Sequence, residues 1–80
     1  MANLHDFQTL LSAYTLLLSD LQSTAEHYRL EAIRYRYTDE PQLEIIYSHL
    51  ASLALDRISE VEEAIEATRQ QIIELSAAIN

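Results

Sequence analysis

The single proline of this chain of 80 residues limits where the backbone can reverse direction, because the chain has no glycine at all. Glycine makes sharp turns at the lowest conformational cost, and its absence leaves the segment that ends at Pro41 as the natural place for one. The residue before a proline is displaced from helical dihedral angles, whereas proline itself is tolerated in a first helical turn. We therefore predict one reversal, at residues 37–40, between two arms of similar length.

The first arm has apolar residues at alternating spacings of three and four, which is typical of a single helix with a heptad seam. This seam consists of Leu4, Phe7, Leu11, Tyr14, Leu18, Leu21, Ala25, Tyr28, Ala32 and Tyr35. Asn3 is the expected N-cap, with Asp6 in the first turn. Ser19 and Gln22 could cap a new helix, which would give a three-helix bundle. Because the apolar spacing keeps its phase there, we predict one helix over about 3–36.

The second arm repeats the same spacing, and we predict a helix over about 41–79 with Thr38 or Asp39 as its N-cap. Its seam consists of Tyr47, Ala51, Ala54, Ile58, Val61, Ile65, Thr68, Ile72, Leu75 and Ile79. Two amphipathic helices joined by a short turn pack against each other. The predicted fold is all-α: one domain over 1–80, an antiparallel two-helix hairpin that resembles a coiled coil.

The beginning of the second arm is apolar around most of the helix circumference, and a single neighbouring helix can cover only a stripe of it. We predict a partner-binding surface here, formed by Leu43, Ile46, Leu50, Leu53 and Leu55. A weaker surplus occurs on the first arm at Leu10, Leu16, Leu17, Leu30 and Ile33. The hairpin is therefore expected to complete a helical bundle, either as a homodimer or with another protein.

The charge balance is strongly acidic, with 13 Asp and Glu residues against five basic residues and a net charge of −8. This balance disfavours direct binding to nucleic acids or anionic membrane surfaces and favours a basic protein partner. The acidic candidates are Asp56, Glu60, Glu63, Glu66 and Glu74. One explanation of these exposed carboxylates is that they keep the protein soluble. The alternative is an inhibitor of the phage or mobile-element type, which mimics nucleic acid and blocks a nucleic-acid-binding protein.

Residues that could carry chemistry are scattered. The chain has no cysteine, and its three histidines form no Glu-x-x-His pair. His27 and Glu31 are one turn apart, but one such pair is a weak indication of a metal site. The glutamates between Glu60 and Glu66 have no nucleophile nearby. We therefore expect no enzyme, no cofactor and no metal.

Two further features bear on partners and location. Arg34, Tyr35, Arg36 and Tyr37 interleave cations with aromatic rings, as single-strand nucleic-acid sites do, but the two arginines lie about 200° apart on a helix. An arginine stacked on a tyrosine, or paired with Glu31 or Glu40, is the simpler expectation.

The apolar runs are too short for a membrane span, and no signal-peptide pattern opens the chain, so we expect a cytoplasmic protein.

In length, in its proline-bearing turn and in its amphipathic pattern, the chain resembles two kinds of small bacterial hairpin. One is the plasmid copy-number regulators, which dimerise into four-helix bundles, and the other is the co-chaperones of type III secretion needle subunits. Neither resemblance assigns a role to an individual residue. Together with the apolar surplus, the sequence predicts a non-catalytic adaptor or chaperone-like protein that binds a partner, or itself, through an apolar helix face.

Overall fold

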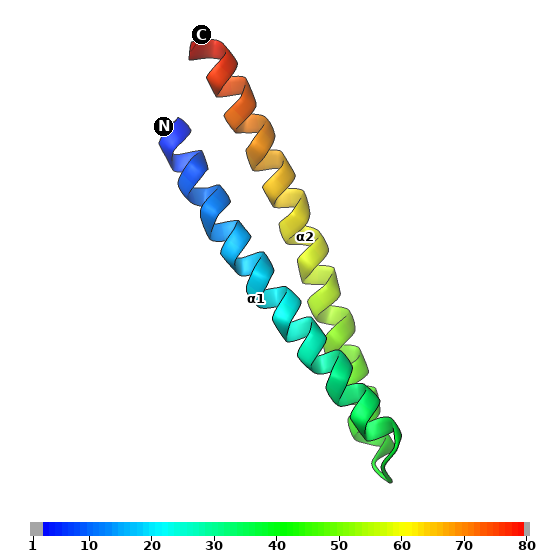
Figure 1. Ribbon diagram of the computed structural model, residues 1–80. Coiled ribbons are helices and arrows are strands. Elements are labelled where there is room, and N and C mark those ends of the chain that lie inside the picture. Colours follow the sequence, from blue (N-terminus) through cyan, green and yellow to red (C-terminus); the bar gives the residue numbers. More distant parts are fainter. Residues whose placement is uncertain (1–2, 80) are drawn as a thin grey trace.

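The computed structural model describes residues 3–79 and consists of two long helices joined by a short turn (Figure 1). Helix α1 spans Leu4–Arg36 and has 33 residues, and helix α2 spans Pro41–Ile79 and has 39. No strand occurs in this part of the chain. Because α1 continues without interruption through Ser19, the three-helix alternative is wrong and the two-helix hairpin is confirmed.

The start of α1 is held by a capping box between Asn3 and Asp6. The Asn3 side chain accepts a hydrogen bond from the Asp6 backbone N–H at 3.1 Å, and the Asp6 carboxylate accepts one from the Asn3 backbone N–H at 3.1 Å. Each bond satisfies a donor that has no partner within the helix. The cap predicted from the sequence is thus confirmed.

The turn is organised by Thr38, which bonds to both sides of the reversal. Its hydroxyl donates to the Tyr35 carbonyl at 2.9 Å and accepts from the Glu40 N–H at 3.3 Å. The Glu40 carbonyl then accepts the first bond of α2, from the Leu43 N–H at 3.1 Å. The predicted N-cap of α2 at Thr38 or Asp39 is therefore wrong: the helix begins at Pro41, directly after Glu40, and Thr38 closes α1 instead.

The two predicted seams meet along the whole length of the hairpin. The least exposed side chains belong to them: Ala25, Ala32, Ala54, Val61, Ile65 and Thr68. The other seam residues are half-buried, except that the side chain of Ile79 lies outside the described part. No large side chain within residues 3–79 is fully enclosed. This follows from the architecture, because two helices make a contact only one layer thick.

Near the turn, three tyrosines join the helices. The rings of Tyr35 and Tyr47 stack with a centroid separation of 5.6 Å and an interplanar angle of 7°. Tyr28, which lies about two turns before Tyr35 in α1, approaches Tyr47 with a centroid separation of 6.1 Å. Arg36 adds an ion pair across the turn, with its Nε 3.1 Å from the Glu44 carboxylate. These contacts fix the register between the two helices at the closed end of the hairpin.

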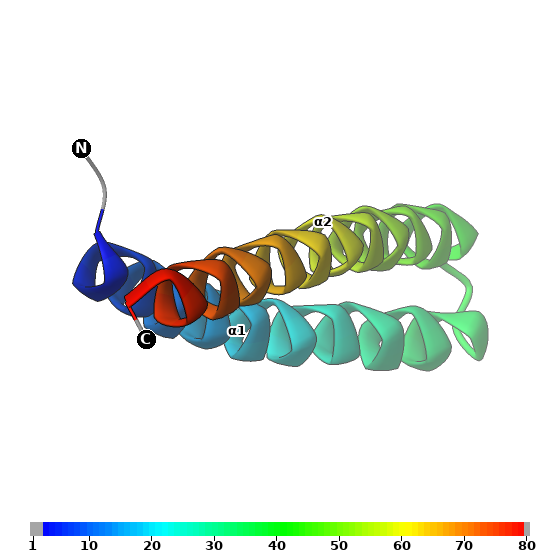
Figure 2. The same cartoon turned by 90° about the horizontal axis from the view of Figure 1, so that it is seen from above.

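The molecule is a rod of 63 × 18 × 14 Å, with both termini at one end and the turn at the other (Figure 1). Its radius of gyration of 18.0 Å compares with about 12 Å for a compact domain of this length. Figures 1 and 2 together show that the helices wind about each other, since they lie side by side at the open end in one view and at the turn in the other. Within residues 3–79, neither helix is apolar enough over a sufficient length to cross a membrane.

Candidate interaction site

Four of the predicted partner-binding residues form a continuous stripe on α2. Leu43, Ile46, Leu50 and Leu53 follow one another at spacings of three, four and three, which places them on one side of the helix beside the seam. Leu43 and Leu50 are half-buried because they also contact the edge of the seam, while Ile46 and Leu53 are 50% and 48% exposed. The stripe is therefore anchored on its inner edge and open to solvent on its outer edge.

Helix α1 contributes two further leucines, Leu10 and Leu17, to the same flank of the hairpin. Both are exposed and lie seven residues apart. Gln22 is five residues beyond Leu17, or about 140° further around the helix, and it lines the opposite flank. We call this set of six residues the leucine face: Leu10, Leu17, Leu43, Ile46, Leu50 and Leu53.

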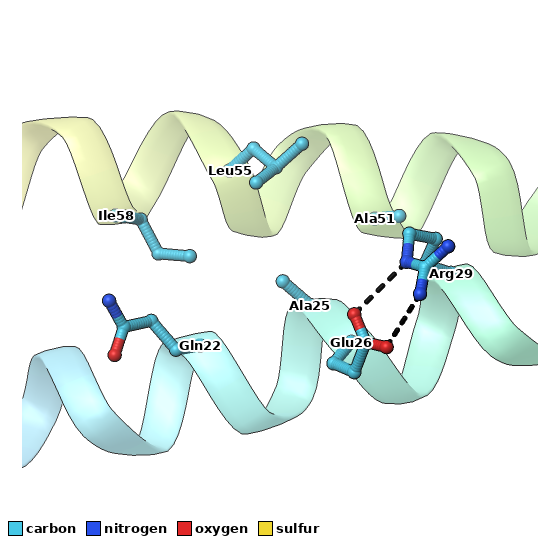
Figure 3. A pocket seen from close by; sticks show the side chains of 7 residues that line it. All are labelled: Gln22, Ala25, Glu26, Arg29, Ala51, Leu55 and Ile58. Carbon is cyan, nitrogen blue, oxygen red and sulfur yellow. Dashed lines mark hydrogen bonds and ion pairs between the residues drawn. The ribbon is translucent and has the colours of Figure 1, made fainter.

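The fifth predicted partner residue, Leu55, lies on the other flank. It is exposed and borders a hollow of about 290 Å³ whose remaining lining residues are Gln22, Ala25, Glu26, Arg29, Ala51 and Ile58. Figure 3 shows Ala25 of α1 and Ile58 of α2 pointing into this space from opposite helices. A second hollow of about 390 Å³ continues towards the turn and shares Arg29, Ala51 and Leu55 with the first. We call the two together the alanine groove.

The groove results from side-chain size in the seam. Ala25, Ala32 and Ala51 border it, and an alanine in a helix contact leaves unfilled the volume that a leucine would occupy. The tyrosines of the same half of the hairpin are large and pack against one another, which joins the helices despite the small alanines. The sequence shows the alternation of Ala and Tyr, but the alanines of the two helices become neighbours only in the folded hairpin.

One ion pair stands at the edge of the groove (Figure 3). Arg29 donates two hydrogen bonds to the Glu26 carboxylate, from Nε at 3.0 Å and from Nη2 at 2.6 Å. These bonds favour the charged forms of both groups, so the pKa of Glu26 is lowered and the pKa of Arg29 is raised from their ordinary values. Both side chains are more than half exposed, which limits what the pair contributes to stability.

The five acidic candidates all lie on the solvent side of α2. Asp56, Glu60, Glu63, Glu66 and Glu74 are exposed. Glu60 is 3.8 Å from Arg57, and Glu66 accepts a hydrogen bond from Gln70 at 3.4 Å. Their spacing distributes them over the outer half of the helix circumference, so they form a broad acidic surface and no pocket.

The remaining polar candidates are engaged in local contacts. The Glu31 carboxylate pairs with Arg34 at 3.1 Å, and the guanidinium of Arg34 lies 5.2 Å from the centre of the Tyr35 ring. The predicted arginine stacking on tyrosine and pairing with Glu31 are thus confirmed, while Arg36 pairs with Glu44 and not with Glu40. Over residues 3–79, no three His, Asp or Glu side chains come together as metal ligands.

Comparison with known proteins yields no relative: no protein-family model, no curated protein and no solved structure matches the chain.

Proposed function

We propose that the chain is a non-catalytic protein–protein interaction module of the cytoplasm, a small acidic adaptor or chaperone-like protein. It binds a partner protein, or a second copy of itself, through the leucine face. The observation that carries this proposal is the stripe of Leu43, Ile46, Leu50 and Leu53 beside the seam, in which the hairpin leaves Ile46 and Leu53 about half exposed. Large contiguous apolar patches on small proteins mark sites of interaction.

The binding free energy that one apolar residue can contribute indicates that several residues must act together. Full burial of a leucine or isoleucine side chain contributes about 2 kcal/mol, so covering the exposed half of Ile46 or Leu53 contributes about 1 kcal/mol. One such residue cannot offset the translational and rotational entropy lost on association. The four residues of the stripe must therefore act together, and Leu10 and Leu17 add apolar surface further along the same flank, towards the open end.

The test compares two leucine substitutions that differ in position. Leu53→Glu places a charge at the C-terminal end of the stripe on α2, and Leu16→Glu places the same charge on α1 at a residue that is 70% exposed and outside the leucine face. We expect Leu53→Glu to abolish association and Leu16→Glu to leave it within about twofold of the original chain. Association is measured as self-association by sedimentation and as retention of proteins from the native host on each immobilised variant.

The folded state is checked by circular dichroism, because a helical spectrum separates loss of binding from loss of fold. If Leu53→Glu unfolds the chain, Ile46→Ser is the milder substitution at the same face. If both variants and the original chain associate equally, the leucine face is not the binding site and the proposal is wrong.

The acidic surface supports the second candidate function, a nucleic-acid mimic that blocks a nucleic-acid-binding protein. Its supporting observation is that all five carboxylates, from Asp56 to Glu74, face solvent on one helix. The two functions differ in what drives binding. A contact through the leucine face depends weakly on salt, whereas a mimic loses affinity steeply as the salt concentration rises.

A further inference from the structure

Most positive charges of the hairpin are paired within the hairpin itself. The chain has no lysine, and four of its five arginines lie between 2.6 and 3.8 Å from a glutamate of the same chain. These pairs are Arg29–Glu26, Arg34–Glu31, Arg36–Glu44 and Arg57–Glu60. The fifth arginine, Arg69, borders a hollow of the open half together with Glu62 and Glu66. The hairpin therefore has few cations to offer to another molecule.

Two carboxylates at the turn border the leucine face and have no such partner. Asp39 and Glu40 line a hollow of about 430 Å³ together with Leu43 and Ile46, which belong to the leucine face. Both acidic residues are exposed, and over residues 3–79 neither of them forms an ion pair. Apolar surface and free negative charge are thus neighbours at this end of the face.

Further along the same flank, the charges are either negative or already paired. Asp20 follows Leu17 by three residues, which places it about 60° further around α1, and it is exposed. Arg57 follows Leu53 by four residues, but its guanidinium is paired with Glu60. Beside the leucine face, the free charge of the carboxylates and arginines in the described part of the chain is therefore negative.

These charges disfavour a second copy of the chain as the partner. Two copies joined through their leucine faces would bring free carboxylates of both chains to one contact. Within residues 3–79, no unpaired arginine borders the face to offset them. Each chain also has a net charge of −8. Like charges lower the affinity and slow the association, so a partner that supplies its own cations is favoured.

The helical architecture limits the form of that partner. Backbone N–H and C=O groups inside a helix bond to each other, so residues 3–79 offer no strand edge to which an extended segment could add. A partner must therefore contact side chains. The spacings of three and four between Leu43 and Leu53 form the kind of ridge against which another helix packs. An amphipathic helix on this flank would complete a three-helix bundle.

We propose that the partner of the leucine face is a basic amphipathic helix of another protein. Its apolar stripe packs on the leucine face, and lysine or arginine side chains beside that stripe pair with Asp39 and Glu40. A helix that extends towards the open end reaches Asp20 as well. This inference rests on the proposed function and names the chemistry of its partner.

Synthetic helices test the charge preference. The basic probe is a peptide of about 18 residues, long enough to span the stripe, with leucines at spacings of three and four and lysines beside them. An acidic probe has glutamate in place of each lysine, and a scrambled probe keeps the basic composition without the helical spacing. At low salt, the full chain should bind the basic probe at least about tenfold more tightly than either other probe. Fluorescence anisotropy of labelled peptides measures the affinities.

Two double variants with the same change in net charge locate the ionic contact. Asp39→Asn with Glu40→Gln should weaken binding of the basic probe about fivefold at low salt, and high salt should reduce this effect. Glu63→Gln with Glu66→Gln should leave binding within about twofold, because both residues lie on the outer surface of the open half. Circular dichroism checks that each variant remains helical.

A second pair of variants tests the apolar contact. Ile46→Ser removes a side chain of the leucine face that is 50% exposed, and Leu16→Ser removes one outside it that is 70% exposed. Ile46→Ser should weaken binding of the basic probe about fivefold, and Leu16→Ser should leave it within about twofold.

The outcomes separate this inference from the proposed function. A preference for the basic probe that Ile46→Ser and the Asp39 and Glu40 substitutions both weaken supports the basic helix. Equal binding of the basic and acidic probes overturns it, and the proposed function then stands if Ile46→Ser weakens both. Equal losses in the two double variants also overturn it, because net charge alone would explain the attraction. If no probe binds, the inference is overturned, and the association of Leu53→Glu compared with Leu16→Glu decides the proposed function.

Discussion

The two halves of the hairpin use the same spacing of apolar residues with different side chains. Near the turn, the seam alternates tyrosines with alanines, and α2 leaves Ile46, Leu53 and Leu55 exposed on its surface. Towards the open end, the buried seam residues include Val61 and Ile65, and the outer surface of α2 is rich in glutamate. Both halves form the same pair of helices. The difference therefore concerns what α2 presents to other molecules: mainly apolar surface near the turn and mainly charge towards the open end, where the exposed leucines lie on α1.

The largest effect is expected from removing the aromatic contact that joins the helices near the turn. Tyr47→Ala eliminates the stacking on Tyr35 and the contact with Tyr28, and it leaves a cavity beside seam alanines that cannot fill it. We expect the free energy of unfolding to fall by about 3 kcal/mol. Urea denaturation at one fixed protein concentration measures it.

The matched control for this prediction is Tyr37→Ala, since Tyr37 is 82% exposed in the turn. It should change the unfolding free energy by less than about 0.5 kcal/mol. Equal effects at the two tyrosines would contradict the view that aromatic packing holds the half near the turn.

A smaller effect is expected at the open end, where α1 begins. Asn3→Ala removes the side-chain acceptor for the Asp6 N–H and the geometry of the capping box. The expected cost is about 1 kcal/mol of unfolding free energy. Asn3→Asp keeps the acceptor and should stay near the original stability. Hydrogen exchange should locate the change in the first turns of α1, and faster exchange at the turn residues 37–40 instead would count against this assignment.

Neutralising the acidic surface should have a weaker effect, of opposite sign. Asp56→Asn, Glu63→Gln and Glu66→Gln together relieve repulsion between like charges about one turn apart and leave the leucine face intact. We expect the unfolding free energy to rise by about 0.5 kcal/mol and binding to stay within about twofold. Denaturation and affinity measurements at low and high salt check both expectations. A loss of partner binding at low salt would instead support the nucleic-acid mimic.

The smallest effect is expected for the ion pair at the edge of the groove. Hydrogen bonds from Arg29 lower the pKa of the Glu26 carboxyl in the folded chain. The pair therefore stabilises the fold at pH values above the ordinary glutamate pKa of about 4.3. That contribution is lost as the pH falls through the lowered pKa. The difference in stability between Glu26→Gln and the original chain should therefore be small at neutral pH and should disappear in strong acid. High salt should also reduce it, and a difference that grows on acidification would contradict the assigned role.

Much of the fold could be predicted from local patterns. The spacing of three and four gave both helices and their seams, Pro41 located the turn, and Asn3 and Asp6 located the first cap. Arg34 stacked on Tyr35 followed from their being neighbours on one helix. Each of these features depends on residues within a few positions of one another, so the sequence by itself determined them.

Only the tertiary structure decided on which flank of the hairpin each exposed apolar residue lies. The sequence pattern places Leu50 and Leu55 in one predicted surface because both are apolar and close in sequence, yet they border opposite sides of the seam. The alanine groove forms only because Ala25 of α1 and Ala51 of α2 border the same space. Thr38 is a predicted N-cap of α2, but its hydroxyl bonds to the Tyr35 carbonyl at the end of α1. The physical reason is that spacing belongs to one helix, whereas flank and register depend on how the turn and the seam side chains bring two helices together.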